Sequence, residues 1–333
     1  MKKTLILLFI AAITCACSSS KGIDKMGQAL DNMSQLTEIK MPKASAVQIA
    51  LDVEYLASDE LKGRDTGSEG IEQAAVYLSE RFSQIGILPY KGSYMDHFEV
   101  KEQEAFNVIA MIPGSDKSLM DEVVVIGAHY DHIGMIQAVA GDSIANGAND
   151  NATGTATVLA IASNFRKIDF NRRTVVFALF SAEEKGLLGS KHLAQRMKKE
   201  GVNVVAMLNF EMTGTPMVNR QYIAYLTGYD SSDMATVFNE ANKDRVVTGK
   251  LDQAAQLNLF MRSDNYSFFQ EFNVPSQTFS TFDFTNFDHY HQVGDDISQV
   301  NTIHMAQLVD AVMPGIFKVV NAEQLKLTPT TNE

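Results

Sequence analysis

The chain has 333 residues, 45% of them hydrophobic, and a formal net charge of −12 at pH 7. A chain of this length and hydrophobic content buries a large core, which excludes disorder throughout, and its negative charge disfavours nucleic acid and anionic lipid as partners. Its two cysteines, Cys15 and Cys17, lie near the N-terminus, so the rest of the chain has neither a disulfide framework nor a cysteine nucleophile.

The N-terminus has the pattern of an export signal. Two lysines precede an apolar stretch over residues 5–13 and then small residues, and this stretch is too short for a membrane-spanning helix. Its end resembles a bacterial lipoprotein cleavage box, which implies removal of residues 1–16 and lipidation of Cys17. We therefore expect an exported protein, anchored only by its lipid, in the outer membrane of a diderm bacterium. The alternative is a secreted protein without an anchor.

Helical and strand patterns alternate after a polar tether at 17–42. Apolar residues at helical spacing predict helices near 49–56, 71–85, 152–166, 187–199 and 305–319. Short continuous apolar runs predict strands at 106–112, 123–129, 173–180, 204–210 and 222–227. This alternation predicts one α/β domain over 43–325, with a mixed, mostly parallel sheet flanked by helices, before a tail at 326–333.

Polar residues follow each strand that could lie at the centre of this sheet. In chain order they are His129 and Asp131 in VVVIGAHYDH, Asp150 in NGANDNATG, Glu183 and Glu184 in VFALFSAEEKG, Glu211 in MLNFEMTG, and His291 in DHYHQVGDD. Ligand sites in open α/β sheets form beyond the carboxyl ends of strands, so these side chains are expected at one edge. Histidines and carboxylates are ligands that zinc accepts, and three carboxylates for two metal ions imply that one carboxylate bridges.

The adjacent glutamates, Glu183 and Glu184, point about 100° apart if they are helical, so they cannot easily share one partner. Taken alone, the pair fits the preference for acidic residues at a helix N-terminus. Beside the other polar residues, it predicts that one glutamate holds a metal ion while its neighbour takes a proton from the attacking water.

The combination of GAHYDH, NGANDNATG, SAEEKGLLGS and RSDNYSFF, in this order, resembles the zinc-dependent exopeptidases. That family includes bacterial leucyl aminopeptidases, aminopeptidase Y, glutamate carboxypeptidase and glutaminyl cyclase. The resemblance runs from about residue 55 to residue 296 and implies the family's α/β fold and a zinc-dependent hydrolase.

Residue by residue, the resemblance implies two zinc ions. His129 would bind one zinc, Glu184 and His291 the other, and Asp150 would bridge them. Glu183 would be the general acid and base, Asp131 would orient a histidine ring, and Tyr290 would donate a hydrogen bond to the oxyanion. Glu211 stands where these aminopeptidases usually carry an aspartate ligand of the first zinc, and its extra methylene lengthens the reach by about 1.5 Å.

The favoured function is a two-zinc aminopeptidase acting on peptides with a free N-terminus, because a negative site beside the aromatic run at 278–287 suits an ammonium and an apolar side chain. Only the last phenylalanines of that run are expected to face substrate. One alternative is a one-zinc glutaminyl cyclase, although the chain has no tryptophan, which the cyclases place at their substrate pocket. A carboxypeptidase has Arg262 as its single candidate, and an inactive peptide-binding lipoprotein stays open. His132 and His289 flank the motifs. Either could contact a metal ligand, but for both residues a role outside the site is the favoured interpretation.

Overall fold

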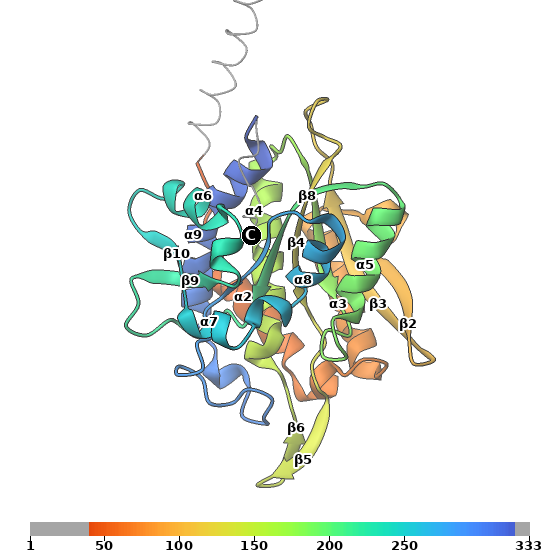
Figure 1. Cartoon of the computed structure of the whole chain (residues 1–333). Coiled ribbons are helices and arrows are strands. Elements are labelled where there is room, and N and C mark those ends of the chain that lie inside the picture. Colours follow the sequence, from red (N-terminus) through yellow and green to blue (C-terminus); the bar gives the residue numbers. More distant parts are fainter. Residues whose placement is uncertain (1–39, 324–333) are drawn as a thin grey trace, which may run out of the picture. The chain divides into compact units, whose positions relative to one another are not determined.

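A computed structural model describes residues 40–323 of the chain (Figure 1). The signal peptide expected at 1–16, Cys17, nearly all of the tether at 17–42, and the tail at 326–333 lie outside the described residues. The domain boundaries and the lipid anchor therefore stay predictions.

A mixed sheet of nine strands forms the centre of the part that the structure describes. Its order is β1–β3–β7–β4–β8–β11–β9–β10, and β2 pairs with β3. The larger strands are β2 (Met95–Val100), β3 (Gln103–Ile112), β4 (Glu122–His129), β7 (Thr174–Phe180), β8 (Asn203–Glu211), β9 (Tyr222–Leu226), β10 (Val246–Gly249) and β11 (Ser276–Ser280), with the short β1 (Leu88–Pro89) at one edge. Strands β7, β4, β8 and β11 are mutually parallel, so their carboxyl ends share one edge of the sheet.

Helices cover both faces of the sheet (Figure 1). On one face α4 packs against β4, β7 and β8 and contacts α2, α3 and α9, while α5 and α8 pack together on the other. The helices are α2 (Ala46–Leu56), α3 (Glu69–Ile85), α4 (Thr153–Ile168), α5 (Leu188–Lys199), α6 (Met234–Glu240), α7 (Asp252–Gln256), α8 (Asn265–Phe272) and α9 (Thr302–Asn321). The predicted α/β fold, with a mixed sheet flanked by helices, is confirmed.

Local sequence explains the main elements. Ser68 caps α3 by accepting a hydrogen bond from the N–H of Ile71, and Gly86 ends the helix with a φ of 81°, a left-handed conformation that glycine adopts without strain. Every residue of β7 is buried, because a central strand with helices over both faces needs an apolar side chain on each side. Although α9 is long and apolar enough to span a membrane, most of it is buried, against α2, α4 and α6.

Several elements have no clear sequence signal. Strand β11 reads SQTFS, a polar sequence, yet all five residues are buried between β8 and β9. The short helices α6 and α8 were likewise not predicted. The hairpin of β5 (Met135–Val139) and β6 (Asp142–Ile144) projects from the domain (Figure 1). In the sequence it lies between Asp131 and Asp150.

Candidate active site at the carboxyl edge of the sheet

His129 is the last residue of β4, and its side chain is buried. Its Nδ1 lies 3.1 Å from the backbone carbonyl oxygen of Asp131, so this nitrogen is placed to donate a proton. Its Nε2 then faces the site as a lone-pair donor, 3.4 Å from Oδ1 of Asp150.

Asp131 contributes more than orientation of a histidine. Its carbonyl faces the ring of His129, while its carboxylate oxygens accept hydrogen bonds from the backbone N–H groups of Glu183 and Glu184, at 3.1 and 3.2 Å. Asp131 therefore joins the loop after β4 to the loop after β7, and it fixes the two adjacent glutamates through their main chain.

Asp150 lies in η3 (Ala148–Ala152), one turn before α4, and its two oxygens face different partners. Oδ1 faces His129, whereas Oδ2 lies 3.2 Å from Nε2 of His291. Asp295 stabilises this turn, because its carboxylate accepts hydrogen bonds from the backbone N–H groups of Asn149 and Asp150 at 2.6 and 3.0 Å. Asp150 thus faces a histidine with each of its two carboxylate oxygens.

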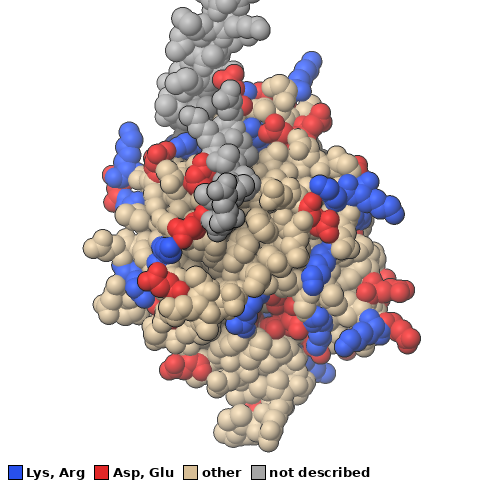
Figure 2. Space-filling model, viewed as in Figure 1, with Lys and Arg blue, Asp and Glu red and all other residues tan. Residues whose placement is uncertain are grey.

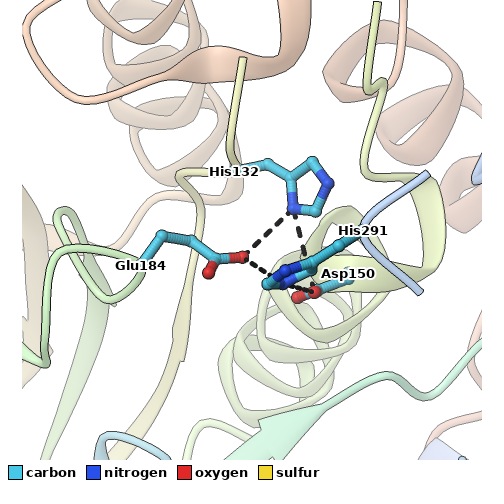
Figure 3. Close-up of side chains that lie close together, drawn as sticks. All are labelled: His132, Asp150, Glu184 and His291. Carbon is cyan, nitrogen blue, oxygen red and sulfur yellow. Dashed lines mark ion pairs between the residues drawn. The ribbon is translucent and has the colours of Figure 1, made fainter. Parts of the chain in front are cut away.

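Three side chains, those of His132, Glu184 and His291, converge beside Oδ2 of Asp150 (Figure 3). Oε1 of Glu184 lies 3.1 Å from Nε2 of His291 and 3.3 Å from Nδ1 of His132. One ligand atom from each of His132, Asp150, Glu184 and His291 lies within 4.8 Å of all the others. Sequence reasoning underrated His132. The only sequence feature that indicated His132 was its position three residues after His129. Because β4 ends at His129, the in–out alternation of side chains along a strand does not predict which way His132 points.

Glu183 and Glu211 line the same depression as Asp150, Glu184 and His291. Burial raises the pKa of Glu183 well above its usual range, and the nearby charge of Glu211 adds to the rise while His129 opposes it. Burial also raises the pKa of Glu211 to about 7. These two carboxyls therefore hold protons far more readily than exposed glutamates do.

Asp150 and His291 are shifted toward their charged forms. Burial opposes ionisation of Asp150, but His129 and His291 outweigh it and hold the pKa of this carboxyl well below its usual range. Burial likewise opposes protonation of His291, but the adjacent carboxylates of Asp150 and Glu184 outweigh it and raise its pKa to about 10.

The site contains buried polar atoms that lack hydrogen-bond partners in the part of the chain that the structure describes. They are Nε2 of His129, Nδ1 and Nε2 of His132, Oε1 of Glu184, Oε2 of Glu211 and Nε2 of His291. Such atoms are rare in folded proteins, because leaving them unpaired costs about 1–3 kcal/mol each. A nitrogen and carboxylate oxygen set of this kind fits zinc, so the residues present can hold the metal that the sequence predicts.

Arg64 ties the site loops together from inside the domain. Its buried guanidinium donates to the carbonyl oxygens of Tyr130, Asn146 and Gly147, at 2.7, 2.7 and 2.9 Å. It also donates to the carbonyl of Leu56. The two chain segments that carry the histidines and Asp150 are thus fixed to one side chain.

A second pocket adjoins the site. Tyr290, Glu211 and Arg262 line both depressions, and the second one extends over largely uncharged side chains: Met212, Tyr225, Thr227, Leu259, Ser263, Thr278, Ser280, Phe282 and Phe284. In the aromatic run at 278–287, Phe279 lies in the core, and the phenylalanines that face the pocket are Phe282 and Phe284 rather than the last one, Phe287.

On the face seen in Figure 2, acidic and basic side chains are interspersed.

The α/β fold brings histidines and carboxylates together at the carboxyl edge of its central strands, where they could hold a metal ion. The model of Peptidase family M28 matches residues 107–314. The chain belongs to this family, which confirms the resemblance read from the motifs.

Individual relatives agree with this assignment. The chain is 29% identical over 255 residues to a probable leucine aminopeptidase of Trichophyton verrucosum; the alignment covers 73% of this chain and 63% of that relative. Among solved structures, the zinc aminopeptidase of Bacillus subtilis matches with a TM-score of 0.64 at 15% identity, covering 87% and 99% of the two chains. A glutaminyl cyclase of Bacteroides thetaiotaomicron matches with a TM-score of 0.61 at 15% identity, covering 86% and 100%. The structural matches establish the fold.

Proposed function

We propose that the protein is a zinc-dependent aminopeptidase with two neighbouring metal positions bridged by Asp150. The observation that carries this proposal is that Oδ1 of Asp150 faces His129 while Oδ2 faces His291. In the proposed arrangement His129 and Glu211 complete one position, and Glu184 and His291 serve the other. The names of the related leucine aminopeptidases support the same reaction class.

Bound zinc would polarise the scissile carbonyl and lower the pKa of the attacking water. The chain's own residues do the rest. Glu183, in the depression beside the ligands, accepts a proton from the water and returns it to the leaving amine. The phenol of Tyr290 keeps its proton, because burial and the charges of Asp150 and Glu184 raise its pKa, so it donates a hydrogen bond to the developing oxyanion.

Substrate preference follows from the two adjoining pockets. The acidic side chains that line the first one suit an α-ammonium group, whereas Met212, Phe282 and Phe284 line the second one and suit an apolar first side chain. We therefore propose peptides with a free N-terminal leucine, methionine or phenylalanine as substrates.

The test is the value of kcat/KM for one leucyl peptide with and without an N-acetyl group. Acetylation removes the positive charge and adds bulk where the amine lies, so the blocked peptide is expected to be nearly inert. A chelator should stop cleavage of the free peptide, and added zinc should restore it. Similar kcat/KM values for both peptides contradict recognition of the amine and point to an endopeptidase or a carboxypeptidase.

A glutaminyl cyclase is the second candidate, because a glutaminyl cyclase is among the solved structures that share the fold and one group of four candidate ligands can hold a single ion. Cyclisation of an N-terminal glutamine without cleavage of leucyl peptides would favour it. The bound zinc provides a further distinction: about two ions per chain favours the aminopeptidase, about one the cyclase, and none a protein that only binds peptides.

We also propose that the protein is exported and lipid-anchored in an outer membrane. The support is the N-terminal sequence alone, with its lysines, its apolar stretch and Cys17 after small residues. Expression of Cys17→Ser in a diderm bacterium should move the protein from the membrane to the soluble periplasmic fraction. A wild-type protein that is already fully soluble would exclude the anchor.

A further inference from the structure

His132 is a buried residue for which the two-zinc scheme has no role. It lies in the loop after β4, three residues beyond His129, and its side chain is 0% exposed. Within residues 40–323, neither ring nitrogen has a hydrogen-bond partner. A structural histidine in a core normally has at least one, because burying both polar atoms unpaired is costly.

The chain provides a specific place for this ring. Gly147 has a φ of +60°, and a Cβ atom there would lie 2.4 Å from Cγ of His132, so any other residue would displace the imidazole. The backbone N–H of His132 donates to the carbonyl of Arg64 at 3.3 Å. His132 is thus held on both its ring and its main chain.

Nδ1 of His132 points at the carboxylates that serve His291. It lies 3.3 Å from Oε1 of Glu184 and 3.8 Å from Oδ2 of Asp150. Nε2 of His291 approaches the same two oxygens from the other side, at 3.1 and 3.2 Å. The two rings meet edge to face, with centroids 5.5 Å apart (Figure 3).

Three of the four nitrogen–oxygen separations are close to those around a tetrahedral ion. With zinc–ligand bonds of about 2.0–2.1 Å, neighbouring ligand atoms of a tetrahedron lie about 3.3 Å apart. The four nitrogen–oxygen distances, 3.1, 3.2, 3.3 and 3.8 Å, surround that value.

We propose that His132 is a fourth protein ligand, through Nδ1, of the metal position formed by Asp150, Glu184 and His291. The inference rests on the proposed metal function and extends it. Four protein ligands close this position in the manner of structural zinc sites, whereas catalytic sites keep one place open. The open place then belongs to the other position, with His129 and Glu211, and the two positions differ: the closed one binds its ion first and more tightly.

A direct test is NMR spectroscopy of the metal-free protein, labelled with ¹⁵N-histidine and titrated with ¹¹³Cd²⁺. A one-bond coupling between cadmium and nitrogen requires a covalent ligand bond, which a hydrogen bond does not produce. With one equivalent of cadmium, two imidazoles should show the coupling, and it should lie on Nδ1 of His132 and Nε2 of His291.

Variants assign the signals and measure the affinity. His132→Phe preserves the bulk of the ring and should leave one coupled imidazole and weaken binding of the first cadmium at least about 100-fold, beyond the 10- to 100-fold range for residues that only orient a ligand. His289→Phe is the matched control and should keep both couplings.

Two outcomes overturn the proposal and differ in what else they affect. If cadmium binds at one equivalent with a coupling to His291 but none to His132, then His132 is not a ligand, and the aminopeptidase proposal is untouched. If the protein binds no cadmium at all, both the inference and the proposed metal function fail.

Discussion

Buried polar groups at the amino ends of strands β4 and β7 have hydrogen-bond partners, whereas several at the carboxyl ends of these strands have none among the described residues. At the amino ends Arg173, which is 1% exposed, donates through Nε to Glu122 at 2.6 Å and through Nη1 to the carbonyl of Ala322 at 2.6 Å. At the carboxyl ends, Nε2 of His129 and Oε1 of Glu184 are buried without hydrogen-bond partners.

The contrast shows that a buried charge does not by itself mark a functional site. Arg173 is satisfied and fastens the C-terminal end of α9 to the sheet, which is a structural role. At the other end Nδ1 of His132, Oε1 of Glu184 and Nε2 of His291 lie close together and have no hydrogen-bond partners among the described residues. Unsatisfied donors and acceptors, rather than charge or burial, distinguish the two ends.

The largest expected effect comes from separating the adjacent glutamates at the carboxyl end. Glu183→Gln should lower kcat by about 10²- to 10⁴-fold, the range for loss of a general acid and base, while keeping the fold and the bound zinc. Glu184→Gln should instead lose zinc. The measurements are steady-state kinetics and zinc content per chain. Equal zinc content with equal loss of activity in both variants would contradict this division of roles.

At the amino end, a change should affect stability and leave chemistry alone. Arg173→Leu leaves Glu122 and the carbonyls at the end of α9 without their donor, so the free energy of unfolding should fall by about 2–3 kcal/mol. Urea unfolding measures it. Lys318→Ala, which removes the exposed pair with Glu240, is the control and should cost at most about 1 kcal/mol. A lower kcat per folded Arg173→Leu molecule would show that the two ends are coupled.

Glu211 tests whether the carboxyl end holds two unequal positions. Glu211→Ala should weaken the second zinc site by more than about 100-fold, beyond the range for residues that only orient a ligand, and leave the first unchanged, whereas Glu211→Asp, with the residue that related aminopeptidases usually carry, should retain both. Calorimetric zinc titration resolves the two steps. Unchanged affinity at both steps in Glu211→Ala would remove this residue from the ligand set.

The smallest expected effect is on the pH dependence of the metal-free protein. Folding raises the pKa of Glu211 and of Asp264 to about 7 and that of His291 to about 10, so the folded state binds more protons than the unfolded state. The contribution of these groups to stability should therefore fall as pH rises, through about 4.5–7 for Glu211, about 3.8–7 for Asp264 and about 6.5–10 for His291. In EDTA, Tm should be lower at pH 8.5 than at pH 5.5 by a few degrees.

Zinc should reverse that trend, because binding displaces the protons from its ligands. The increase in Tm on adding zinc should thus be larger at pH 8.5 than at pH 5.5. A Tm in EDTA that rises over this interval would show that the site does not set the pH response.

Much of the fold follows from sequence periodicity. Helix α3 and strands β4 and β7 carry strong apolar patterns and appear where they were predicted. Strand β11 does not, because it lies between two strands and buries serine, glutamine and threonine through side-chain hydrogen bonds that only the tertiary structure supplies. Ser276, for example, donates to the carbonyl of Asn265.

The site was predictable to the extent that its residues follow strands. His129 and Glu211 end strands β4 and β8, and Asp150 and Glu184 follow in the adjoining loops. The position of His132 depends on how the chain turns after β4 and on the space above Gly147, and neither can be read from spacing. The role of Asp131 cannot be read from spacing either, because the backbone N–H groups that its carboxylate accepts hydrogen bonds from lie in a loop that begins 52 residues later in the sequence.

The clamp made by Arg64 has a practical consequence for labelling the protein. The hairpin of β5 and β6 leaves and re-enters the domain between two carbonyls that this guanidinium holds, those of Tyr130 and Asn146. Its tip, at Ala140 and Gly141, is exposed. The hydrogen bonds of Arg64 at the base of the hairpin separate this tip from the candidate metal ligands. The tip is therefore a suitable place to insert a short peptide tag or a sequence that carries a fluorophore.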